Sequence, residues 1–298
     1  MILRTAAATF GLSLTGWNAQ AAPAKAKKIL FFSKSSGYEH SVIKRKDNEP
    51  AFAEKILADL GPKHGVEFSF SKDGSLFTPD YVKQFDAFFF YTTGDLTWAG
   101  TDKNPPMSPE GKAAFLDAIK QGKGFIGTHS ASDTFHTNEP SGKEDRPARY
   151  KNYGDAVDPY VKMLGGEFIK HDKQQKAKMR VVDAKFPGMP QADFEWMEEW
   201  YSIKEFAKDL HVLLVQETAG MEGPSYQRPS YPATWARLHG KGRVFYTSMG
   251  HREDVWQNPL FQDLLFGGVN WALRNVDAKI PPNLDKVAPG HATIPPQS

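Results

Sequence analysis

One short stretch, GKGFIGTHSASDTFH at residues 122–136, constrains the fold of this chain more than any other. Its residues 124–128 are small and apolar, as in a strand of a parallel sheet that is covered on both faces. Polar residues follow at once, and His129 stands between the small residues Gly127 and Ala131. In many α/β enzymes such a sharp strand-to-helix turn presents a Ser or Cys nucleophile. We therefore expect an elbow that projects the His129 side chain out of the sheet, with little core packing.

Strand and helix patterns alternate through the first half of the chain. Nearly continuous apolar runs predict buried strands, and segments with helical spacing and cap residues predict the helices between them. The predicted strands are residues 28–33, 66–70, 86–91 and 124–128, and the predicted helices are residues 51–60 and 109–121. This order predicts an α/β fold, a flavodoxin-like three-layer sandwich with a mainly parallel central sheet.

The second half is less regular as far as Pro232. We expect an inserted segment that packs over one sheet edge near the site, and then a return to the sheet. The predicted elements are a helix at 153–164, strands at 179–183 and 211–216, a hairpin of 234–238 with 243–247, and a helix at 261–273. The tail at 280–298 contains five prolines and is expected to be poorly ordered.

Composition excludes several classes of function. Of the 298 residues, 40% are hydrophobic and 24% are charged, which is ordinary for a globular protein. The net charge is +2, and the basic cluster at residues 25–28 is too short to argue for a nucleic-acid partner. The chain has no cysteine, so every cysteine-based mechanism is excluded.

The amino terminus has the pattern of a secretory signal peptide. Arg4 precedes an apolar stretch, and Ala19-Gln20-Ala21 places small residues where a signal peptidase reads. We expect residues 1–21 to be removed, residues 22–279 to form the folded domain, and the protein to be periplasmic or secreted. The alternative is a buried N-terminal helix. No other run approaches the roughly 18 to 20 apolar residues of a membrane span.

Polar residues follow four predicted strands at their carboxyl ends. His40 follows the first strand, Asp95 the third, His129 and Asp133 the next, and His251 a late strand. Parallel α/β sheets bind their ligands at this edge. A single polar residue at a strand end is more often a cap or turn residue than a catalytic group. Three histidines at one edge nevertheless favour a functional site.

The segment EEWY at residues 198–201 has two interpretations. Carboxylates accept hydrogen bonds from sugar hydroxyls, and aromatic rings stack on the apolar face of a pyranose. Alternatively, Trp196 and Trp200 form a core stripe while Glu198 and Glu199 are solvated. Adjacent glutamates point apart on a helix or a strand, so at most one of them enters a site.

Six stretches in order along the chain resemble the ThuA-like (trehalose-utilisation) family. They cover residues 28 to 273 and read KILFFSKSSGYEHSVI, FFFYTTGDL, GFIGTHSASDTF, LGGEFIKH, EEWYSIKEF and YPATWARLHGKGRVFYTSMGHREDVWQNPLFQDLLFGGVNWAL. The family's fold is related to that of class I glutamine amidotransferases. The resemblance implies the same fold here, although without a cysteine glutamine hydrolysis through a thioester is not available.

The resemblance also implies a set of pocket residues. As catalytic residues it implies His129, His251 and Glu199, and as substrate-binding residues His40, Asp95, Asp133, His171 and Tyr201. His171 departs from the family pattern, because Asp172 follows it where relatives usually carry a proline.

Two classes of function remain open. The first is a carbohydrate-active enzyme, acting on a disaccharide, glycoside or keto-sugar derivative by acid–base chemistry of histidines and carboxylates. A divalent metal such as zinc, held by His129, His251 and a carboxylate, is a further hypothesis within it. The second is a non-catalytic sugar-binding or structural module. The expected partner in both is a small-molecule carbohydrate, and a homo-oligomer is an open hypothesis.

Overall fold

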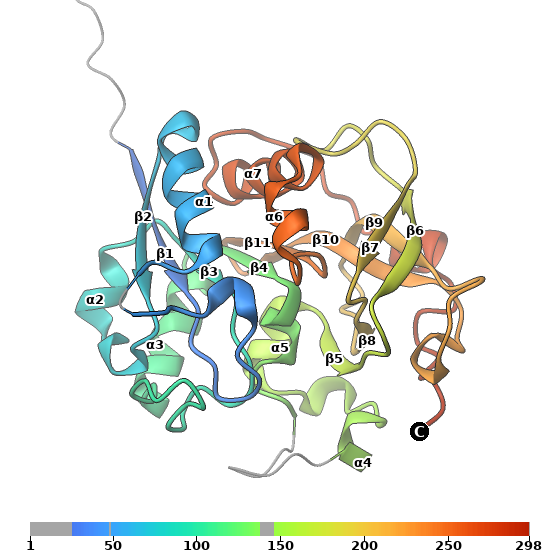
Figure 1. Cartoon of the computed structure of the whole chain (residues 1–298), viewed down its shortest axis with the longest axis horizontal. Coiled ribbons are helices and arrows are strands. Elements are labelled where there is room, and N and C mark those ends of the chain that lie inside the picture. Colours follow the sequence, from blue (N-terminus) through green and yellow to red (C-terminus); the bar gives the residue numbers. More distant parts are fainter. Residues whose placement is uncertain (1–25, 48, 138–145, 298) are drawn as a thin grey trace, which may run out of the picture.

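The fold is built around one large mixed sheet with helices on both faces (Figure 1). The computed structural model describes residues 26–47, 49–137 and 146–297, so the predicted signal peptide lies outside the described residues. The strand order of the sheet is β2-β1-β3-β4-β11-β10-β9-β6-β7, and β5 pairs with β8 in a second small sheet. The strands are β1 (Lys27–Phe32), β2 (Val66–Ser71), β3 (Ala87–Phe90), β4 (Gly124–Thr128), β5 (Glu167–Lys170), β6 (Gln175–Val181), β7 (Phe194–Glu198), β8 (Ser202–Lys204), β9 (His211–Glu217), β10 (Tyr231–His239) and β11 (Gly242–Thr247).

The core of the sheet is parallel, and the predicted fold class is confirmed. β1 pairs in parallel with β2 and β3, β3 with β4, and β4 with β11. The resulting order of five parallel strands, 2-1-3-4-11, is that of a flavodoxin-like sheet. The remaining pairs, from β11 outward through β10, β9, β6 and β7, are antiparallel.

Helices form a layer on each face of the sheet (Figure 1). The helices are α1 (Phe52–Leu60), α2 (Pro79–Lys83), α3 (Pro109–Lys120), α4 (Arg146–Arg149), α5 (Pro159–Leu164), α6 (Glu253–Gln257), α7 (Pro259–Ala272) and α8 (Leu284–Val287). One apolar cluster joins α1, α6 and α7 to one face, and a second joins α2, α3 and α5 to the other. β1 contributes to both, because its successive side chains point to opposite faces.

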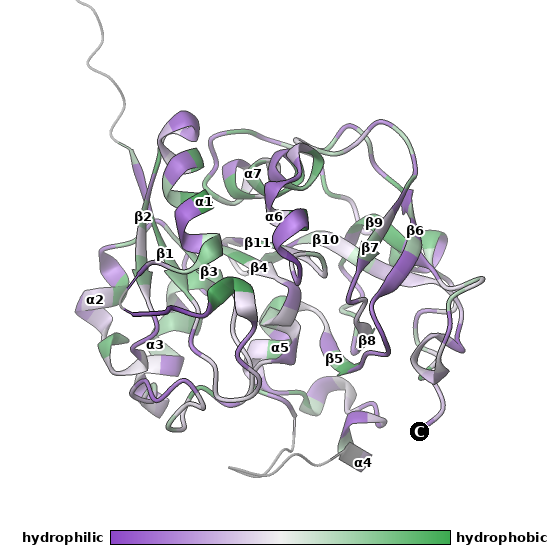
Figure 2. Cartoon of the chain, viewed as in Figure 1, coloured by the Kyte–Doolittle hydropathy of each residue, from purple (hydrophilic) through white to green (hydrophobic). Residues whose placement is uncertain are grey.

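Helix caps follow the sequence signals closely. Ser108 accepts a hydrogen bond from the Gly111 amide at 2.9 Å and Pro109 opens α3, as predicted. Figure 2 shows both polar and apolar stretches on α1, as expected for a helix with one buried side. Within the described residues, no helix combines the length and apolar character that crossing a membrane would require.

The inserted segment was predicted to pack over one sheet edge, and that expectation is wrong. Its strands β9, β6 and β7 instead continue the same sheet through backbone hydrogen bonds to β10 and to one another. β7 was not predicted at all. The helix predicted at 153–164 is divided into a 3-10 turn and α5, because Asp158 caps a new helix that begins at Pro159.

The tail is packed rather than poorly ordered over residues 280–297. Asn283 accepts a hydrogen bond from the Val212 amide at 2.7 Å and donates one back to the Val212 carbonyl at 3.1 Å, so the tail is fastened to β9. Leu284 and Ala288 are buried. Proline content therefore did not predict disorder here, because these side-chain contacts fix the backbone.

Candidate functional site

The predicted turn at His129 is present directly after β4. His129 has a φ of +44°, a conformation that non-glycine residues rarely adopt. A Cβ at Gly127 would lie 3.1 Å from that of Ala131, so small residues are needed on both sides. The helix that follows is a five-residue 3-10 helix. One detail of the prediction is wrong: the His129 side chain is fully buried instead of projecting out of the sheet with little core packing.

Three histidines and a glutamate meet at the carboxyl edge of the parallel strands. His40 follows β1, His129 follows β4, His251 follows β11, and Glu199 directly follows β7. One nitrogen or oxygen atom from each of the four side chains lies within 4.8 Å of the others. His40 and His129 are buried, while Glu199 and His251 keep 12% and 16% of their side-chain surface exposed. The cluster therefore reaches solvent on one side.

The closest atoms of this cluster belong to Glu199 and two histidines. Glu199 Oε2 lies 3.0 Å from His251 Nδ1 and 3.4 Å from His129 Nε2. The two histidine nitrogens are 3.2 Å apart. His40 Nε2 lies farther out, 4.0 Å from Glu199 Oε2 and 3.4 Å from the Tyr201 hydroxyl.

His129 is held in one orientation by the backbone. Its Nδ1 lies 3.0 Å from the Ser248 carbonyl, an acceptor, so this nitrogen carries the proton and donates. In the neutral ring Nε2 then presents a lone pair to the cluster. Histidines that bind metals commonly donate their other ring N–H to a carbonyl, which selects the tautomer in this way.

The loop that carries His251 is anchored by buried groups. Glu198 accepts hydrogen bonds from the backbone amides of Gly250 at 2.8 Å and His251 at 3.2 Å. Tyr91 and Trp256 both donate to the Gly250 carbonyl, at 3.0 and 2.8 Å. Gly250 has a φ of +119°, which only glycine adopts readily. The two adjacent glutamates thus point apart, as predicted: Glu199 into the cluster and Glu198 into this loop.

Electrostatics separate the protonation states within the cluster. Burial, reinforced by the neighbouring His129 and His251, holds the pKa of His40 well below its ordinary value. Burial also lowers the pKa of His129, although Glu199 opposes this. Burial acts against charge on Glu199 too, but its contacts with His129 and His251 outweigh burial and leave the pKa of Glu199 below its ordinary value. Near neutral pH the site thus holds a carboxylate and at least two neutral imidazoles.

His251 and Glu198 deviate in the other direction. Burial disfavours charge on His251, but its contact with Glu199 outweighs burial and raises the pKa of His251. Burial raises the pKa of Glu198 to about 7, against the lowering effect of the backbone amides that it accepts.

The other predicted pocket residues fall into two groups. The Tyr201 ring lies 4.2 Å from that of His129, and His171 Nδ1 lies 3.4 Å from Glu199 Oε1, so both border the cluster. Asp95 does not join it and accepts hydrogen bonds from the Thr97 amide and hydroxyl, as a turn cap. Asp133 pairs with His136 at 2.6 Å and Arg149 at 3.2 Å.

His136 belongs to a buried ionic network beside the cluster. Its Nε2 faces Asp133, and its Nδ1 lies 3.0 Å from Glu167 Oε1. Burial and the Arg149 charge favour the neutral ring, but the hydrogen bonds to Asp133 and Glu167 outweigh them and raise the pKa of His136 to about 9. Sequence reasoning gave His136 no role, because Glu167 reaches it only through the fold.

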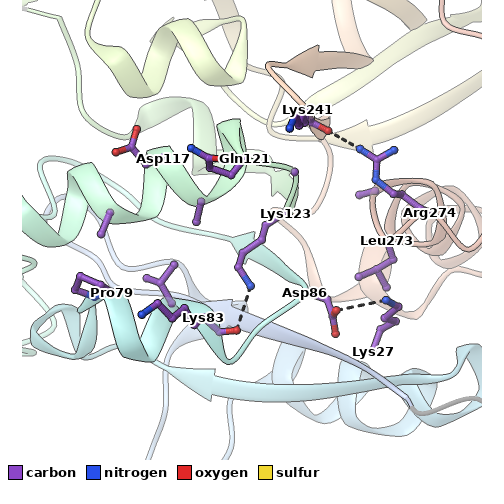
Figure 3. A pocket seen from close by; sticks show the side chains of 15 residues that line it. Lys27, Pro79, Lys83, Asp86, Asp117, Gln121, Lys123, Lys241, Leu273 and Arg274 are labelled. Carbon is purple, nitrogen blue, oxygen red and sulfur yellow. Dashed lines mark hydrogen bonds and ion pairs between the residues drawn. The ribbon is translucent and has the colours of Figure 1, made fainter.

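A cleft of about 800 Å³ lies at the opposite, amino-terminal edge of the same parallel strands (Figure 3). Its lining includes five basic side chains, Lys27, Lys83, Lys123, Lys241 and Arg274. Four of them have partners in place. Lys27 pairs with Asp86, Lys83 with Asp80, Lys123 donates to the backbone carbonyls of Lys83 and Phe85, and Arg274 donates to that of Lys241.

Residues 28–272 match the model of a protein family described as ThuA, trehalose utilisation. The chain therefore belongs to the ThuA family. No protein with a curated description matches it.

Several solved structures share the fold. A ThuA-like protein from Bacteroides uniformis is 20% identical with a TM-score of 0.58, over 86% of this chain and 95% of that one. A ThuA-like protein from Parabacteroides merdae is 16% identical with a TM-score of 0.58, over 91% and 97%. A cytoplasmic protein of Salmonella typhimurium LT2 is 14% identical with a TM-score of 0.52, over 84% and 100%. At these identities the likeness shows the fold alone.

Proposed function

We propose that the protein is an enzyme that acts on a carbohydrate at a divalent metal ion bound by His40, His129, Glu199 and His251. One observation carries the proposal: Glu199 Oε2, His129 Nε2 and His251 Nδ1 lie within 3.4 Å of one another. Three electron-rich atoms this close repel one another unless a proton or a cation lies between them.

The spacing of these atoms fits a single metal ion. Zinc binds histidine nitrogen and carboxylate oxygen at about 2.0 to 2.2 Å, which places neighbouring ligand atoms of one ion about 3 to 3.5 Å apart. The three closest atoms match this spacing. His40 Nε2, 4.0 Å from Glu199 Oε2, would be the fourth ligand of the set. Imidazole ligands suit zinc, iron, copper or nickel, and the carboxylate widens the choice to manganese.

The residues around this site supply further chemistry. A bound metal ion would polarise a carbonyl or hydroxyl oxygen of the substrate. His171, whose side chain is 40% exposed, contacts the Asp172 carbonyl and Glu199 through Nδ1. Its Nε2 is therefore the nitrogen left to take or give a proton at a substrate atom. The Tyr201 phenol stays protonated, because burial raises its pKa well above the ordinary value, and it can donate a hydrogen bond.

The carbohydrate part of the proposal rests on two supports. The family model is described as trehalose utilisation, which names a disaccharide. The site itself combines a carboxylate with the aromatic and imidazole rings of Tyr201 and His171, which suits a ligand with many hydroxyls. We take the substrate class to be a disaccharide, a glycoside or a keto-sugar derivative.

Metal analysis and a substrate screen test this proposal together. After metal-replete growth, we expect roughly one transition-metal ion per chain by elemental mass spectrometry, and its loss in His129→Ala and Glu199→Gln. His239→Ala is the matched control, because His239 lies on the β10–β11 hairpin, at the opposite end of these strands from the histidine cluster. The screen uses common disaccharides and their 3-keto derivatives.

Two results would overturn the proposal in different ways. If metal-free protein turned over a sugar at full rate, the metal would have no part in the reaction. A proton shared between Glu199 and His251 would then explain how close these atoms lie. A sugar that binds equally to the wild type and both variants without turnover would favour a sugar-binding module.

We further propose that the chain is exported, on the pattern of Arg4, the apolar run and Ala19-Gln20-Ala21. Intact-mass measurement on protein from the native cell envelope should show loss of about 21 residues, the length that this pattern implies. Recovery of the uncut chain from the cytoplasm would contradict export without affecting the chemistry of the site.

A further inference from the structure

We infer that Tyr38 binds a sugar ring of the substrate by stacking, and that it positions the sugar beside the histidine cluster. This inference rests on the proposed function and specifies how the substrate is held. It starts from a side chain whose placement the fold does not otherwise explain.

Tyr38 is the most exposed of the large apolar side chains that the structure describes. It is 70% exposed, whereas Leu238, the next most exposed, reaches 48%. The other members of this group are aliphatic residues. Scattered exposed aliphatic side chains are ordinary on a protein surface. A largely exposed aromatic ring next to a buried polar cluster is less ordinary, because aromatic rings contribute most when they are covered.

The backbone that presents this ring is fixed in place. The Thr93 hydroxyl donates to the Tyr38 carbonyl at 2.9 Å and accepts from the Gly37 amide at 3.2 Å. The Thr101 hydroxyl donates to the Gly37 carbonyl. Gly94 packs so closely that a Cβ there would lie 2.8 Å from the Gly37 nitrogen. The backbone of the loop is therefore fixed before a ligand binds, and binding at Tyr38 needs little further ordering of it.

The Tyr38 ring stands directly beside one of the proposed metal ligands, His40. The centroids of the Tyr38 and His40 rings are 5.0 Å apart, with the rings perpendicular at 89°. His40 in turn lies 4.8 Å from His129 and 5.2 Å from His251, centroid to centroid. A sugar on the exposed part of Tyr38 would extend its hydroxyls toward Glu199 and His251, the two ligands that keep some exposure.

The chemistry of the Tyr38 ring indicates which kind of ligand binds there. A pyranose presents one face of C–H groups that packs on an aromatic ring, while its hydroxyls point outward to polar groups. Ser41, three residues after Tyr38, donates a hydrogen bond to Glu253 at 2.6 Å, and this exposed pair offers such groups at the same edge. A flat apolar partner surface would meet these polar groups unfavourably.

Three variants and one control test the inference. Tyr38→Ala should weaken binding of the sugar about tenfold or more, seen as a raised KM or Kd, while kcat changes less than about threefold. Tyr38→Phe and Tyr38→Trp should keep binding within about threefold, because they keep a stacking surface. Leu238→Ala, an exposed apolar residue on the far hairpin, should change nothing. Metal content and melting temperature should match the wild type in every variant.

The measurement uses metal-replete full-length protein, with trehalose and its 3-keto derivative as first probes in calorimetry and turnover assays, followed by the wider disaccharide panel. Equal binding by wild type and Tyr38→Ala would overturn the inference and leave the proposed function standing. Sugars that fail to bind even the metal-loaded wild type would overturn both. A variant that loses metal together with binding would make Tyr38 a structural support of His40 instead of a sugar platform.

Discussion

The two edges of the parallel sheet differ in how their polar side chains are paired. At the amino-terminal edge, three lysines and the arginine of the cleft bond to carboxylates or to backbone carbonyls. At the carboxyl edge, His40, His129, Glu199 and His251 mostly face one another. The first arrangement is complete without a ligand. The second brings acceptor atoms together and leaves them in need of a proton or a cation.

Burial explains why the two edges differ. The Lys27 and Asp86 side chains are 44% and 41% exposed, so water solvates them and their pairing contributes little. His40 and His129 are buried, and His40 Nδ1 has no hydrogen-bond partner among the described residues. A buried polar atom without a partner in the protein is a place where a ligand, an ion or a water molecule can bind. The number of charges in a cleft is therefore a poorer guide to a site than their burial and their lack of partners.

The largest expected effect is that of His129→Ala. Loss of a ligand of the proposed metal ion should lower turnover by about a hundredfold or more and leave the purified protein without that ion. Because His129 is fully buried and bonded to Ser248, the variant should also melt several degrees lower, unlike an exposed residue. Lys241→Ala at the opposite edge should change neither quantity. Full turnover by a folded His129→Ala protein would contradict the assignment of the functional site to the carboxyl edge.

Glu198→Gln should have the next largest effect. Glu198 Oε2 accepts from the amides of Gly250 and His251, and Oε1 accepts from the Glu199 amide, so a glutamine would turn its NH2 donor toward one of these two positions. The His251 loop or Glu199 should then shift, and metal affinity should fall about 10- to 100-fold, as when a residue that orients a metal ligand is replaced. Glu253→Gln, on the exposed rim, is the control. Metal affinity, measured by competition with a chelator, tests this prediction. An unchanged affinity would show that the loop is held by Tyr91 and Trp256 alone.

The parallel core and the histidines at its edge could be predicted from the sequence for physical reasons. Strands that are covered on both faces read as continuous apolar runs, and the residues that end them must gather at one edge. β1, β3, β4 and β11 all follow this rule, and the prediction of three histidines at one edge is met by His40, His129 and His251.

The features that could not be predicted depend on contacts between distant segments. β7 is half-buried and carries charged residues, so its pattern resembles that of a loop. Glu198 acts on a loop about fifty residues away, and Glu167 joins His136 across the insertion. His129 was expected to be exposed, because a turn at a strand end suggests projection into solvent. Its burial arises because Tyr201 and Ser248 cover it.

A smaller effect concerns the pH dependence of stability beside the site. The pKa of His136 is raised to about 9, above its value of about 6.5 in the unfolded chain. Because its pKa is raised, His136 makes its full contribution to stability below about pH 6.5. This contribution is lost as the pH rises through 9. We expect the free energy of unfolding to fall by on the order of 1 to 3 kcal/mol across that interval.

Denaturant unfolding of the wild type and His136→Gln at pH 6, 7.5 and 9 measures this effect. The difference between the two proteins should shrink as the pH rises, because only the wild type loses a favourable charge. A constant difference would mean that His136 stays neutral between Asp133 and Glu167.

The smallest effect is expected at the amino-terminal edge, where Lys27→Ala removes one member of a pair whose atoms are 3.4 Å apart. Exposed pairs of this kind contribute about 0.2 to 1 kcal/mol and are screened by salt, so the melting temperature should change by no more than a degree or two at physiological ionic strength. Turnover and metal content should equal those of the wild type, because the cleft and the cluster lie at opposite ends of the same strands. Asp86→Asn is the wrong comparison here, since Asp86 also accepts from the Lys28 amide and would disturb β1. If Lys27→Ala changed turnover, or if sulfate raised the melting temperature of the wild type but not of this variant, the cleft would bind an anion and the contrast between the two edges would have to be abandoned.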